Sequence, residues 1–205
     1  RANSETLIDG ALEDKKQAKV FAKAILHNSE RLSDMVSSLL DLTRIEYGEL
    51  KLNFQNINLN EFIENFILSI SNLSKKKNIN IQYKSSHIGD INADPQAIER
   101  ILNNLVDNAI KYSKEDSQIV ISTSNDSDDH IKVMVEDNGP GISDEDQDYI
   151  FGRFFRTASA RATDNQGSGL GLAIVKHLVN SLNGEVGIDS VPGKGSVFWF
   201  TVPKF

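Results

Sequence analysis

A glycine-rich stretch near the end of the chain, NQGSGLGLAIVKHLV at residues 165–179, has the composition of a phosphate-binding loop. Its glycines Gly167, Gly169 and Gly171 alternate with single residues and lead directly into an apolar pattern with helical spacing. Because glycine lacks a Cβ, such a loop can adopt positive φ and turn successive N–H groups toward one anion at the start of a helix. Two common nucleotide-binding loops fit the sequence badly. A dinucleotide-binding loop follows a strand, whereas this stretch follows the polar segment RTASARATDNQ. A P-loop that included GKGS at 193–196 would need its first glycine at position 188, where the chain has Ile188. Either another kind of phosphate site or only a flexible loop is indicated.

Three polar residues in NNLVDNAIKYS fall on one face of a predicted helix. Asn104 and Asn108 are one turn apart, and Lys111 follows three residues after the second asparagine. An amide oxygen suits Mg²⁺, a cation that usually keeps several waters and takes further ligands from substrate phosphates, and a lysine beside it would neutralise those phosphates. A solvated polar stripe explains the same spacing equally well.

A predicted strand ends at VEDNGPGIS, in which Asp137 is followed by Gly139 and Gly141. A carboxylate only accepts hydrogen bonds, so Asp137 could accept from the exocyclic amino group of adenine, whereas guanine presents a carbonyl there. The glycines would let the backbone approach the purine, although an ordinary strand-to-helix turn explains them as well. Ser143, with Asp146 three residues later, predicts the cap of a following helix.

The segment IFGRFFRT precedes a stretch of small and polar residues that extends to Gln166. Phe151 and Phe154 are predicted to be core anchors under this surface loop. Arg156 lies at the root of the loop, where a guanidinium could reach a terminal phosphate. Residues 157–166 carry no periodic pattern and are predicted to form a flexible lid over the nucleotide.

The elements that hold these residues begin with a long predicted helix. Apolar residues recur at steps of three and four over 15–46 without proline or glycine, which indicates an amphipathic helix whose seam packs against a partner. The preceding SETLI indicates the end of another helix and DGALED a turn, so a helical hairpin is predicted to open the chain. The pattern changes near 46–50, and we therefore predict a hairpin domain over 1–47 and a second domain over 48–205.

The second domain alternates predicted strands and helices. Period-two alternation predicts strands in ELKLNF, NINIQYK, QIVISTS, IKVMVE, EVGIDS and SVFWFTVP. Helical spacing predicts helices in NLNEFIENFILSI and over 93–113, where Asp94 is the predicted N-cap and Pro95 the first helical residue. Hairpins imply antiparallel pairing, so we predict an α+β fold: a two-layer α/β sandwich with helices over one face of a mixed or antiparallel sheet.

Composition narrows the classes of function. The 205 residues are 39% apolar, enough for a core, and the net charge of −7 argues against a nucleic-acid surface. KKK at 75–77 is predicted to be a solvated helix end. Without cysteine there is no disulfide or Cys-ligated zinc, and no apolar run is long enough to span a membrane.

In order and spacing, NNLVDNAIKYS, DNGPGIS, IFGRFFR, GSGLGLAI and GKGS resemble the N, G1, F, G2 and G3 boxes of sensor histidine kinases, within the gyrase, Hsp90, kinase and mismatch-repair ATPase superfamily. HNSERLSDMVSSLLDLTRIEYGEL is similar to the second helix of the dimerisation and phosphotransfer hairpin in phosphate-sensor-like kinases. The resemblance implies ATP and Mg²⁺ as cofactors, with Asn108 as the magnesium ligand and Asn104, Lys111 and Arg156 in catalysis. The implied nucleotide-binding residues are Asn104, Asn108, Lys111, Tyr112, Asp137, Gly139, Gly141, Ile142, Phe155, Arg156, Gly167, Ser168, Gly169, Leu170, Gly171 and Leu172.

Position 104 separates branches of this superfamily. In the hydrolysing branches a glutamate one turn before the magnesium-binding asparagine activates water, whereas Asn104 offers no basic proton acceptor. A histidine nucleophile is partly neutral near neutral pH and needs no strong base, so the site suits phosphoryl transfer to histidine. The alternatives are a nucleotide-binding pseudokinase, against which the intact boxes count, and an ATP-hydrolysing switch, against which Asn104 counts.

The phosphoacceptor histidine of the family lies on the first hairpin helix, before an acidic residue, and His27 on the second helix does not match that box. We therefore expect the acceptor to lie upstream of this chain, which would be a cytoplasmic region of a membrane-anchored sensor. The resemblance further implies a homodimer formed through the hairpin, a response regulator receiver domain as partner, no nucleic acid, and a membrane only through segments outside the chain. The histidines present are expected to be structural or surface residues: His27, His87, His130 and His177.

Overall fold

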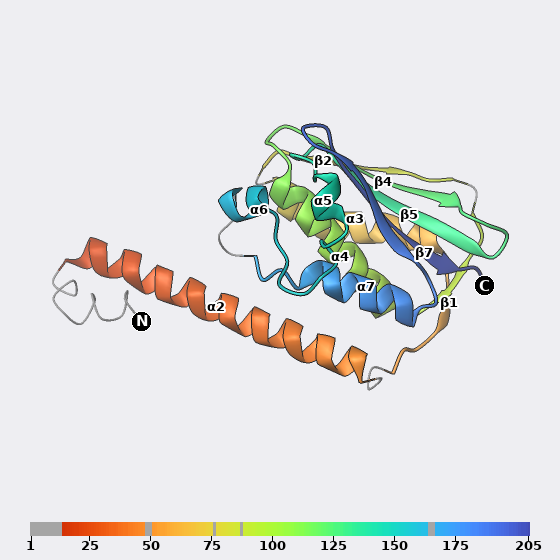
Figure 1. The fold of residues 1–205 in the computed structure, drawn as a ribbon, viewed down its shortest axis with the longest axis horizontal. Coiled ribbons are helices and arrows are strands. Elements are labelled where there is room, and N and C mark those ends of the chain that lie inside the picture. Colours follow the sequence, from red (N-terminus) through yellow and green to blue (C-terminus); the bar gives the residue numbers. More distant parts are fainter. Residues whose placement is uncertain (1–13, 48–50, 76, 87, 164–166) are drawn as a thin grey trace. The chain divides into compact units, whose positions relative to one another are not determined.

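The computed structural model describes residues 14–47, 51–75, 77–86, 88–163 and 167–205 (Figure 1). The chain divides into two compact units, Arg1–Asp41 and Leu42–Phe205. The predicted first arm of the hairpin and most of its turn lie outside the described residues. The predicted domains 1–47 and 48–205 stay a prediction.

Helix α2, Lys15–Glu46, confirms the predicted long helix. Its start is fixed by Asp14, whose carboxylate accepts hydrogen bonds from the N–H groups of Lys16 at 2.8 Å and Gln17 at 3.3 Å. Leu26 and Leu32 on this helix are exposed. Across the described parts of the chain, no helix is both long and apolar enough to cross a membrane.

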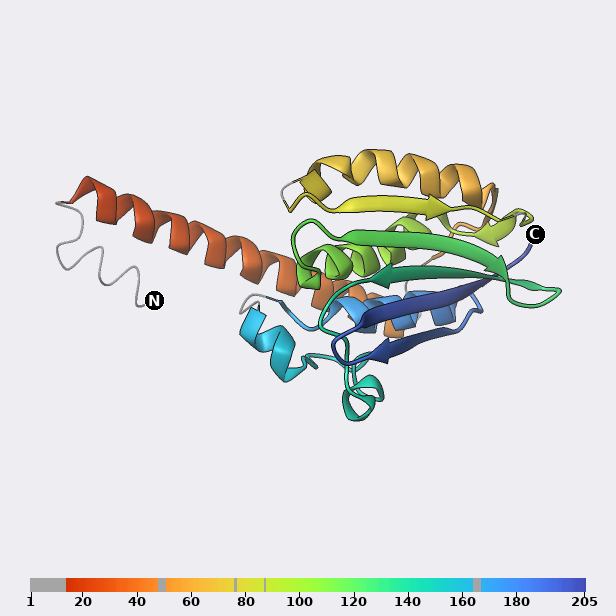
Figure 2. The ribbon, with the colours of Figure 1, turned by 90° about the horizontal axis from the view of Figure 1, so that it is seen from above.

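A five-stranded sheet organises the second unit, with the strand order β2-β4-β5-β7-β6 (Figure 2). β2 and β4 are parallel and the other neighbours are antiparallel, so the sheet is mixed. On β5, Ile131, Val133 and Val135 alternate with more exposed residues and are buried, which is the pattern of a sheet with one covered face. The strand bounds are β2 Asn80–Lys84, β4 Gln118–Asn125, β5 His130–Asp137, β6 Val186–Val191 and β7 Gly195–Pro203.

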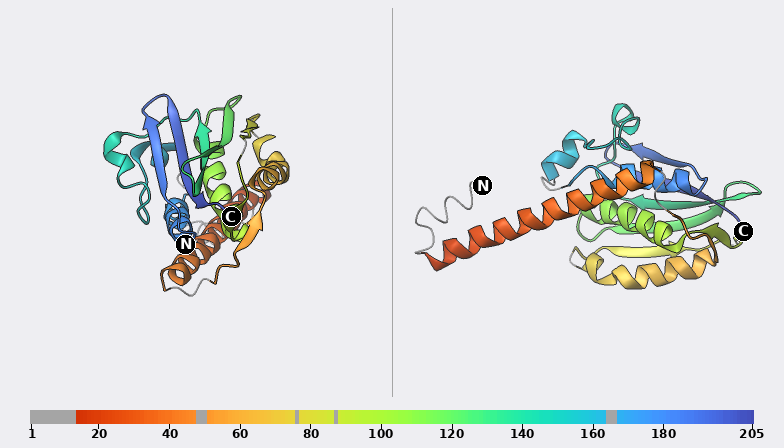
Figure 3. Two further views of the ribbon diagram at one scale, coloured as in Figure 1. Left: turned by 90° about the vertical axis from the view of Figure 1, so that its right-hand side faces the viewer. Right: turned by 90° about the horizontal axis from the view of Figure 1, so that it is seen from below.

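Three helices cover that face of the sheet: α3 (Leu59–Lys75), α4 (Pro95–Tyr112) and α7 (Gly171–Ser181) (Figure 3). α4 packs on β4, β5 and α7. Ile98, Ile101 and Leu105 recur at helical spacing on its inner side and are fully buried. This arrangement confirms the predicted α+β class with a two-layer sandwich.

The start of α4 is tied to an earlier part of the chain. As predicted, Asp94 caps the helix, and its Oδ1 accepts from the N–H groups of Gln96 at 2.8 Å and Ala97 at 3.1 Å. Its Oδ2 accepts from the N–H of Asn53 at 2.7 Å. The predicted strand in ELKLNF is wrong for residues 51–54, because Asn53 turns toward this cap instead of pairing in a sheet.

A small second sheet replaces that predicted strand. β1 (Gln55–Ile57) pairs antiparallel with β3 (Ile91–Ala93), an element too short to stand out in the sequence. Because β3 runs directly into Asp94, this pairing holds the residues that start α4.

Two short helices flank the glycine-containing segments. α5 (Asp144–Gln147) is capped by Ser143 as predicted. α6 (Ala158–Thr163) lies in the stretch in which the sequence carries no periodic pattern, and this helix was not predicted. Thr157 Oγ1 accepts the N–H of Ala160 at 3.0 Å, and the alanines of α6 are strong helix formers. Residues 164–166 lie outside the described residues, and the role of the segment as a lid stays a prediction.

Candidate nucleotide-binding site

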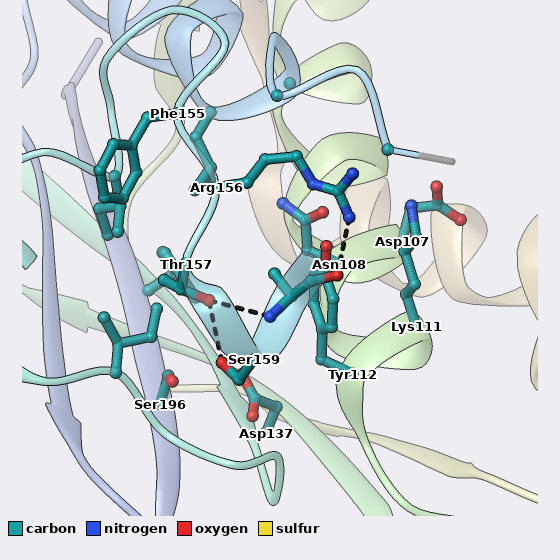
Figure 4. Close-up of a pocket in the computed structure, with 18 of the residues that line it drawn as sticks. Asp107, Asn108, Lys111, Tyr112, Asp137, Phe155, Arg156, Thr157, Ser159 and Ser196 are labelled. Atoms are coloured by element: carbon teal, nitrogen blue, oxygen red, sulfur yellow. Dashed lines mark hydrogen bonds between the residues drawn. The ribbon is translucent and has the colours of Figure 1, made fainter. Parts of the chain in front are cut away.

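One cavity of about 210 Å³ is bordered by α4, the end of β5, the start of β7, and the two glycine-containing segments that follow β5 and precede α7 (Figure 4). The segment from Phe155 to Ala160 also contributes to its wall. Motifs that are far apart in the sequence therefore meet at one site.

The polar face of α4 is directed at this cavity. Asn104, Asn108 and Lys111 all line it and are half-buried. Asn104 Nδ2 donates to the carbonyl of Arg100 at 2.8 Å. A Cβ added at Gly171 would lie 2.7 Å from Asn104 Oδ1, so a larger residue at the start of α7 would displace the Asn104 amide from its present position. The open alternative of a merely solvated stripe is thereby disfavoured.

Asp137 stands at the end of β5 and is 6% exposed. The N–H of Gly139 donates to Asp137 Oδ1 at 2.7 Å, and the backbone of Ser196 also hydrogen-bonds this carboxylate. Desolvation by burial raises the pKa of Asp137; the two backbone hydrogen bonds oppose this effect, and Glu136 adds a smaller upward effect. The site thus holds a buried, acceptor-rich carboxyl group beside the cavity.

The loop after Asp137 is locked against the β6–β7 hairpin. Gly141 has φ +69°, and a Cβ there would lie 2.1 Å from the carbonyl oxygen of Val191, so this position needs glycine. The N–H of Ile142 donates to Ser190 Oγ at 2.9 Å. Ser190 Oγ in turn donates to the carbonyl of Gly195 at 2.8 Å and lies 2.9 Å from Ser196 Oγ. One hydroxyl therefore connects the loop to the strand that carries Ser196.

Arg156 extends toward α4 in Figure 4, and its Nη2 donates to the carbonyl of Ala160 in α6 at 2.7 Å. Phe154 was predicted to be a core anchor, and this prediction is wrong because its side chain is 56% exposed. Its backbone has φ +60°, and its N–H donates to the carbonyl of Gly169 at 2.9 Å. A Cβ at Gly169 would lie within 3.0 Å of three backbone atoms of residues 154 and 155. This close packing turns the side chain of Phe154 outward and leaves Phe155 on the cavity wall.

Most of the residues implied by the motifs line this cavity together. Gly139 does not line it but supports Asp137, and Leu170 is fully buried at the start of α7. The predicted residues found on the wall are Asn104, Asn108, Lys111, Tyr112, Asp137, Gly141, Ile142, Phe155, Arg156, Gly167, Ser168, Gly169, Gly171 and Leu172.

Sequence reasoning missed several wall residues. Asp107 adjoins Asn108 inside the quoted motif, and Ser196 closes GKGS, so both had a signal that was not used. Thr157, Ser159 and Ala160 lie in the segment predicted to be a lid but were not predicted individually, because the helix α6 was not predicted. Pro140, Ile150 and Phe198 complete the wall.

Histidine is absent from the described residues that line the cavity. His27 is exposed on α2, and His130 Nε2 lies 3.2 Å from the carbonyl oxygen of Asn183. His177 is half-buried in α7; desolvation lowers its pKa, and Arg153 and Lys176 lower it further. His87 lies outside the described residues.

Residues 93–205 match the family described as histidine kinase-, DNA gyrase B-, and HSP90-like ATPases. Sensor-like histidine kinase SenX3 of Mycobacterium tuberculosis is 34% identical over 200 residues, which cover 98% of this chain and 48% of that protein. Sensor histidine kinase WalK of Bacillus subtilis is 31% identical over 205 residues, which cover 99% of this chain and 33% of that protein. The chain thus spans about half or less of the length of these curated relatives.

Solved structures show the same architecture. Acinetobacter baumannii histidine kinase AdeS superposes with a TM-score of 0.79 at 25% identity, over 98% of this chain and 91% of that one. Full-length ShkA in complex with AMPPNP gives 0.77 at 26% identity, over 91% and 39%. Histidine kinase ThkA in complex with the response regulator protein TrrA gives 0.71 at 27% identity, over 93% and 51%. Since the matched region contains every element that borders the cavity, the chain belongs to the histidine kinase-, DNA gyrase B-, and HSP90-like ATPase family, as its motifs implied.

Proposed function

We propose that this chain is the ATP-binding catalytic region of a two-component sensor histidine kinase, which transfers the γ-phosphoryl group of ATP to a histidine for relay to a response regulator aspartate. The observation that carries the proposal is the meeting, in one cavity, of an acceptor-only carboxyl group, a polar helix face with a lysine, and a glycine-rich helix start. The names of SenX3, WalK and AdeS support the same assignment.

Adenine is assigned to the side of the cavity formed by Asp137 and the loop of Gly141 and Ile142. The ionised carboxyl group accepts the amino hydrogens of adenine and repels the carbonyl of guanine. The hydroxyl of Ser190 bonds both to the N–H of Ile142 in this loop and to the carbonyl of Gly195 in β7, and so fixes the loop beside Asp137.

The triphosphate is assigned to the opposite side, where α4 meets the glycine segment 167–172. The start of α7 offers backbone N–H groups, while Lys111 and Arg156 supply positive charge. Asn108 fits a magnesium ligand, because its amide lies on the wall, and an amide oxygen is a hard donor that suits Mg²⁺ together with oxygens of the phosphates. When bound, Mg²⁺ would neutralise charge on the phosphates.

Transfer is favoured over hydrolysis by Asn104, a wall residue at the position where the hydrolysing branches of the superfamily have a water-activating glutamate. The work left to the protein is to orient ATP and neutralise charge, which leaves the γ-phosphate open to an incoming nucleophile. We assign that nucleophile to the hairpin of the parent protein, which would pair with a second copy through α2. The complex of ThkA with TrrA supports a response regulator as the next acceptor. We assign the chain to the cytoplasmic side of a membrane-anchored sensor.

The test uses the parent protein with its complete hairpin, incubated with γ-labelled ATP and Mg²⁺. We expect acid-labile, base-stable label on the protein, and loss of both this label and the magnesium dependence of ATP binding in Asn108→Ala. Asn65→Ala, an exposed asparagine on α3 outside the cavity, is the matched control and should behave as the unmodified protein. ATP binding without label or turnover would instead support a pseudokinase, and rapid phosphate release without label would support a hydrolysing switch.

A further inference from the structure

A lysine from the segment between α3 and β2 closes the end of α4. Lys77 Nζ donates to the carbonyl of Lys111 at 2.7 Å, to that of Ile110 at 2.9 Å, and to that of Ser113 at 3.4 Å. The expectation that KKK at 75–77 is a solvated helix end is therefore wrong for Lys77, whose ammonium group is spent on backbone acceptors.

The end of α4 needs such a partner, because the last four carbonyls of a helix lack intrahelical donors. The N–H of Ser113 takes the carbonyl of Ala109 at 3.0 Å. The ammonium group of Lys77 donates to the carbonyls of Ile110 and Lys111, which are two of the remaining three carbonyls, and these hydrogen bonds are strengthened by its charge.

The position of this helix end creates an electrostatic conflict. Asn108, Lys111 and Tyr112 line the cavity from the last turn of α4, where the helix dipole places partial negative charge. A triphosphate bound beside this end would be repelled by it. The ammonium group of Lys77 lies on these carbonyls and offsets their charge without itself being among the wall residues.

Lys77 is itself held in place by its neighbours. Its carbonyl accepts the N–H of Asp116 at 3.2 Å. Asn78, with φ +53°, donates from Nδ2 to Asp116 Oδ1 at 2.7 Å. Two bonds from the segment that follows α4 thus fix the backbone from which the Lys77 side chain reaches the helix end.

We propose that Lys77 is a positioning residue for the phosphate side of the site: it fixes the last turn of α4, with Asn108 and Lys111, and compensates the negative helix end that faces a polyanion. This inference rests on the proposed function, since it takes ATP as the ligand. It adds a residue outside the five motifs to the machinery of phosphate binding.

The experiment compares Lys77→Met, which keeps the stem without the charge, with Lys77→Arg, which keeps the charge. Lys204→Met is the matched control, because Lys204 Nζ also donates to a backbone carbonyl, that of Ser127 at 2.9 Å, outside the cavity. ATP affinity is measured by calorimetry with Mg²⁺ and adenosine affinity by an NMR titration. We expect Lys77→Met to bind ATP about tenfold more weakly while adenosine affinity stays unchanged, and Lys77→Arg to recover most of the ATP affinity.

An unchanged ATP affinity in Lys77→Met, or equal losses for ATP and adenosine, would overturn the inference, because a merely structural role would not distinguish the two ligands. If Lys77→Met does not fold, as judged by thermal unfolding, Lys77→Gln replaces it and the same two outcomes decide. Failure of the unmodified protein to bind ATP would count against the proposed function instead.

Discussion

Replacing Asp137 with asparagine probes the base side of the site, because the two side chains share a shape and differ in charge and in one donor group. In the structure the carboxylate accepts backbone hydrogen bonds from Gly139, at 2.7 Å, and from Ser196. An asparagine has a single acceptor oxygen. If that oxygen keeps the hydrogen bond from Gly139, the NH₂ group faces either the N–H of Ser196 or the amino group of adenine. In either case two hydrogen-bond donors face each other, and no hydrogen bond forms.

The size of the effect follows from that lost contact. A hydrogen bond to a charged acceptor contributes about 1.5–3 kcal/mol, which corresponds to about one to two orders of magnitude in affinity. Guanine gains where adenine loses, because its carbonyl can accept from the new NH₂ group. We therefore expect the ratio of ATP to GTP affinity in Asp137→Asn to fall by about tenfold or more.

The same change should stabilise the ligand-free protein at neutral pH. Burial raises the pKa of Asp137 above its ordinary 3.8, so the folded state binds this proton more tightly than the unfolded chain does. Stability contributed by such a group falls as the pH rises above 3.8, because ionisation is harder in the fold. Asparagine does not ionise and removes this loss, so the two proteins should become closer in stability as the pH approaches 3.8.

Calorimetry with ATP and GTP measures the first effect, and urea unfolding at neutral and acidic pH measures the second. Asp189→Asn is the control, since this carboxylate on β6 is exposed and outside the cavity wall. An unchanged preference for ATP in Asp137→Asn would refute the assignment of adenine to this carboxyl group. A variant less stable than the parent at neutral pH would refute the desolvation argument.

Three further expectations concern other parts of the second unit. Ser190→Ala should lower the free energy of unfolding by about 1–3 kcal/mol, because the Ile142 N–H loses its acceptor; urea unfolding checks this, and an unchanged midpoint would contradict it. Between pH 7.5 and 5.5, the melting temperature of His177→Gln should fall less than that of the unmodified protein. Burial and Arg153 lower the pKa of His177 in the fold, so its protonation below pH 6.5 favours the unfolded chain. Limited proteolysis should cut at the exposed Arg161 and slow with an ATP analogue, whereas equal rates would argue against a lid.

The predictable parts of this fold were those with a strong local signal. Asp94 and Pro95 predicted the start of α4, and the alternation of apolar residues predicted the five strands of the main sheet. Both signals are local, because a cap and a periodic pattern depend on residues only a few positions apart. The site was predictable for a related reason: glycines such as Gly141 and Gly169 have positive φ and lie so close to backbone atoms that a larger residue would clash.

What sequence reasoning missed depends on partners far along the chain. Asn53 leaves the strand pattern because Asp94, 41 residues later, accepts its N–H. Phe154 looks like a core residue, yet the close packing of Gly169 on its backbone turns it outward. Lys77 has the sequence context of a surface charge, but its ammonium group donates to the carbonyl of Lys111 at the end of α4, 34 residues later in the chain.

The ties at the two ends of α4 bear on where the smallest independently folding piece of this protein begins. The region matched by the family starts at residue 93, but Asn53 and Lys77 hold the first and last turns of α4 from outside that region. β2, which pairs with β4, also lies before residue 93. A fragment trimmed to the matched region would therefore expose β4 as a new sheet edge, open to pairing with other chains, and would release both ends of the helix that lines the site. A fragment that keeps both ties to α4 and the pairing of β2 with β4 therefore has to include the chain from Asn53 onward, 40 residues before the matched region begins.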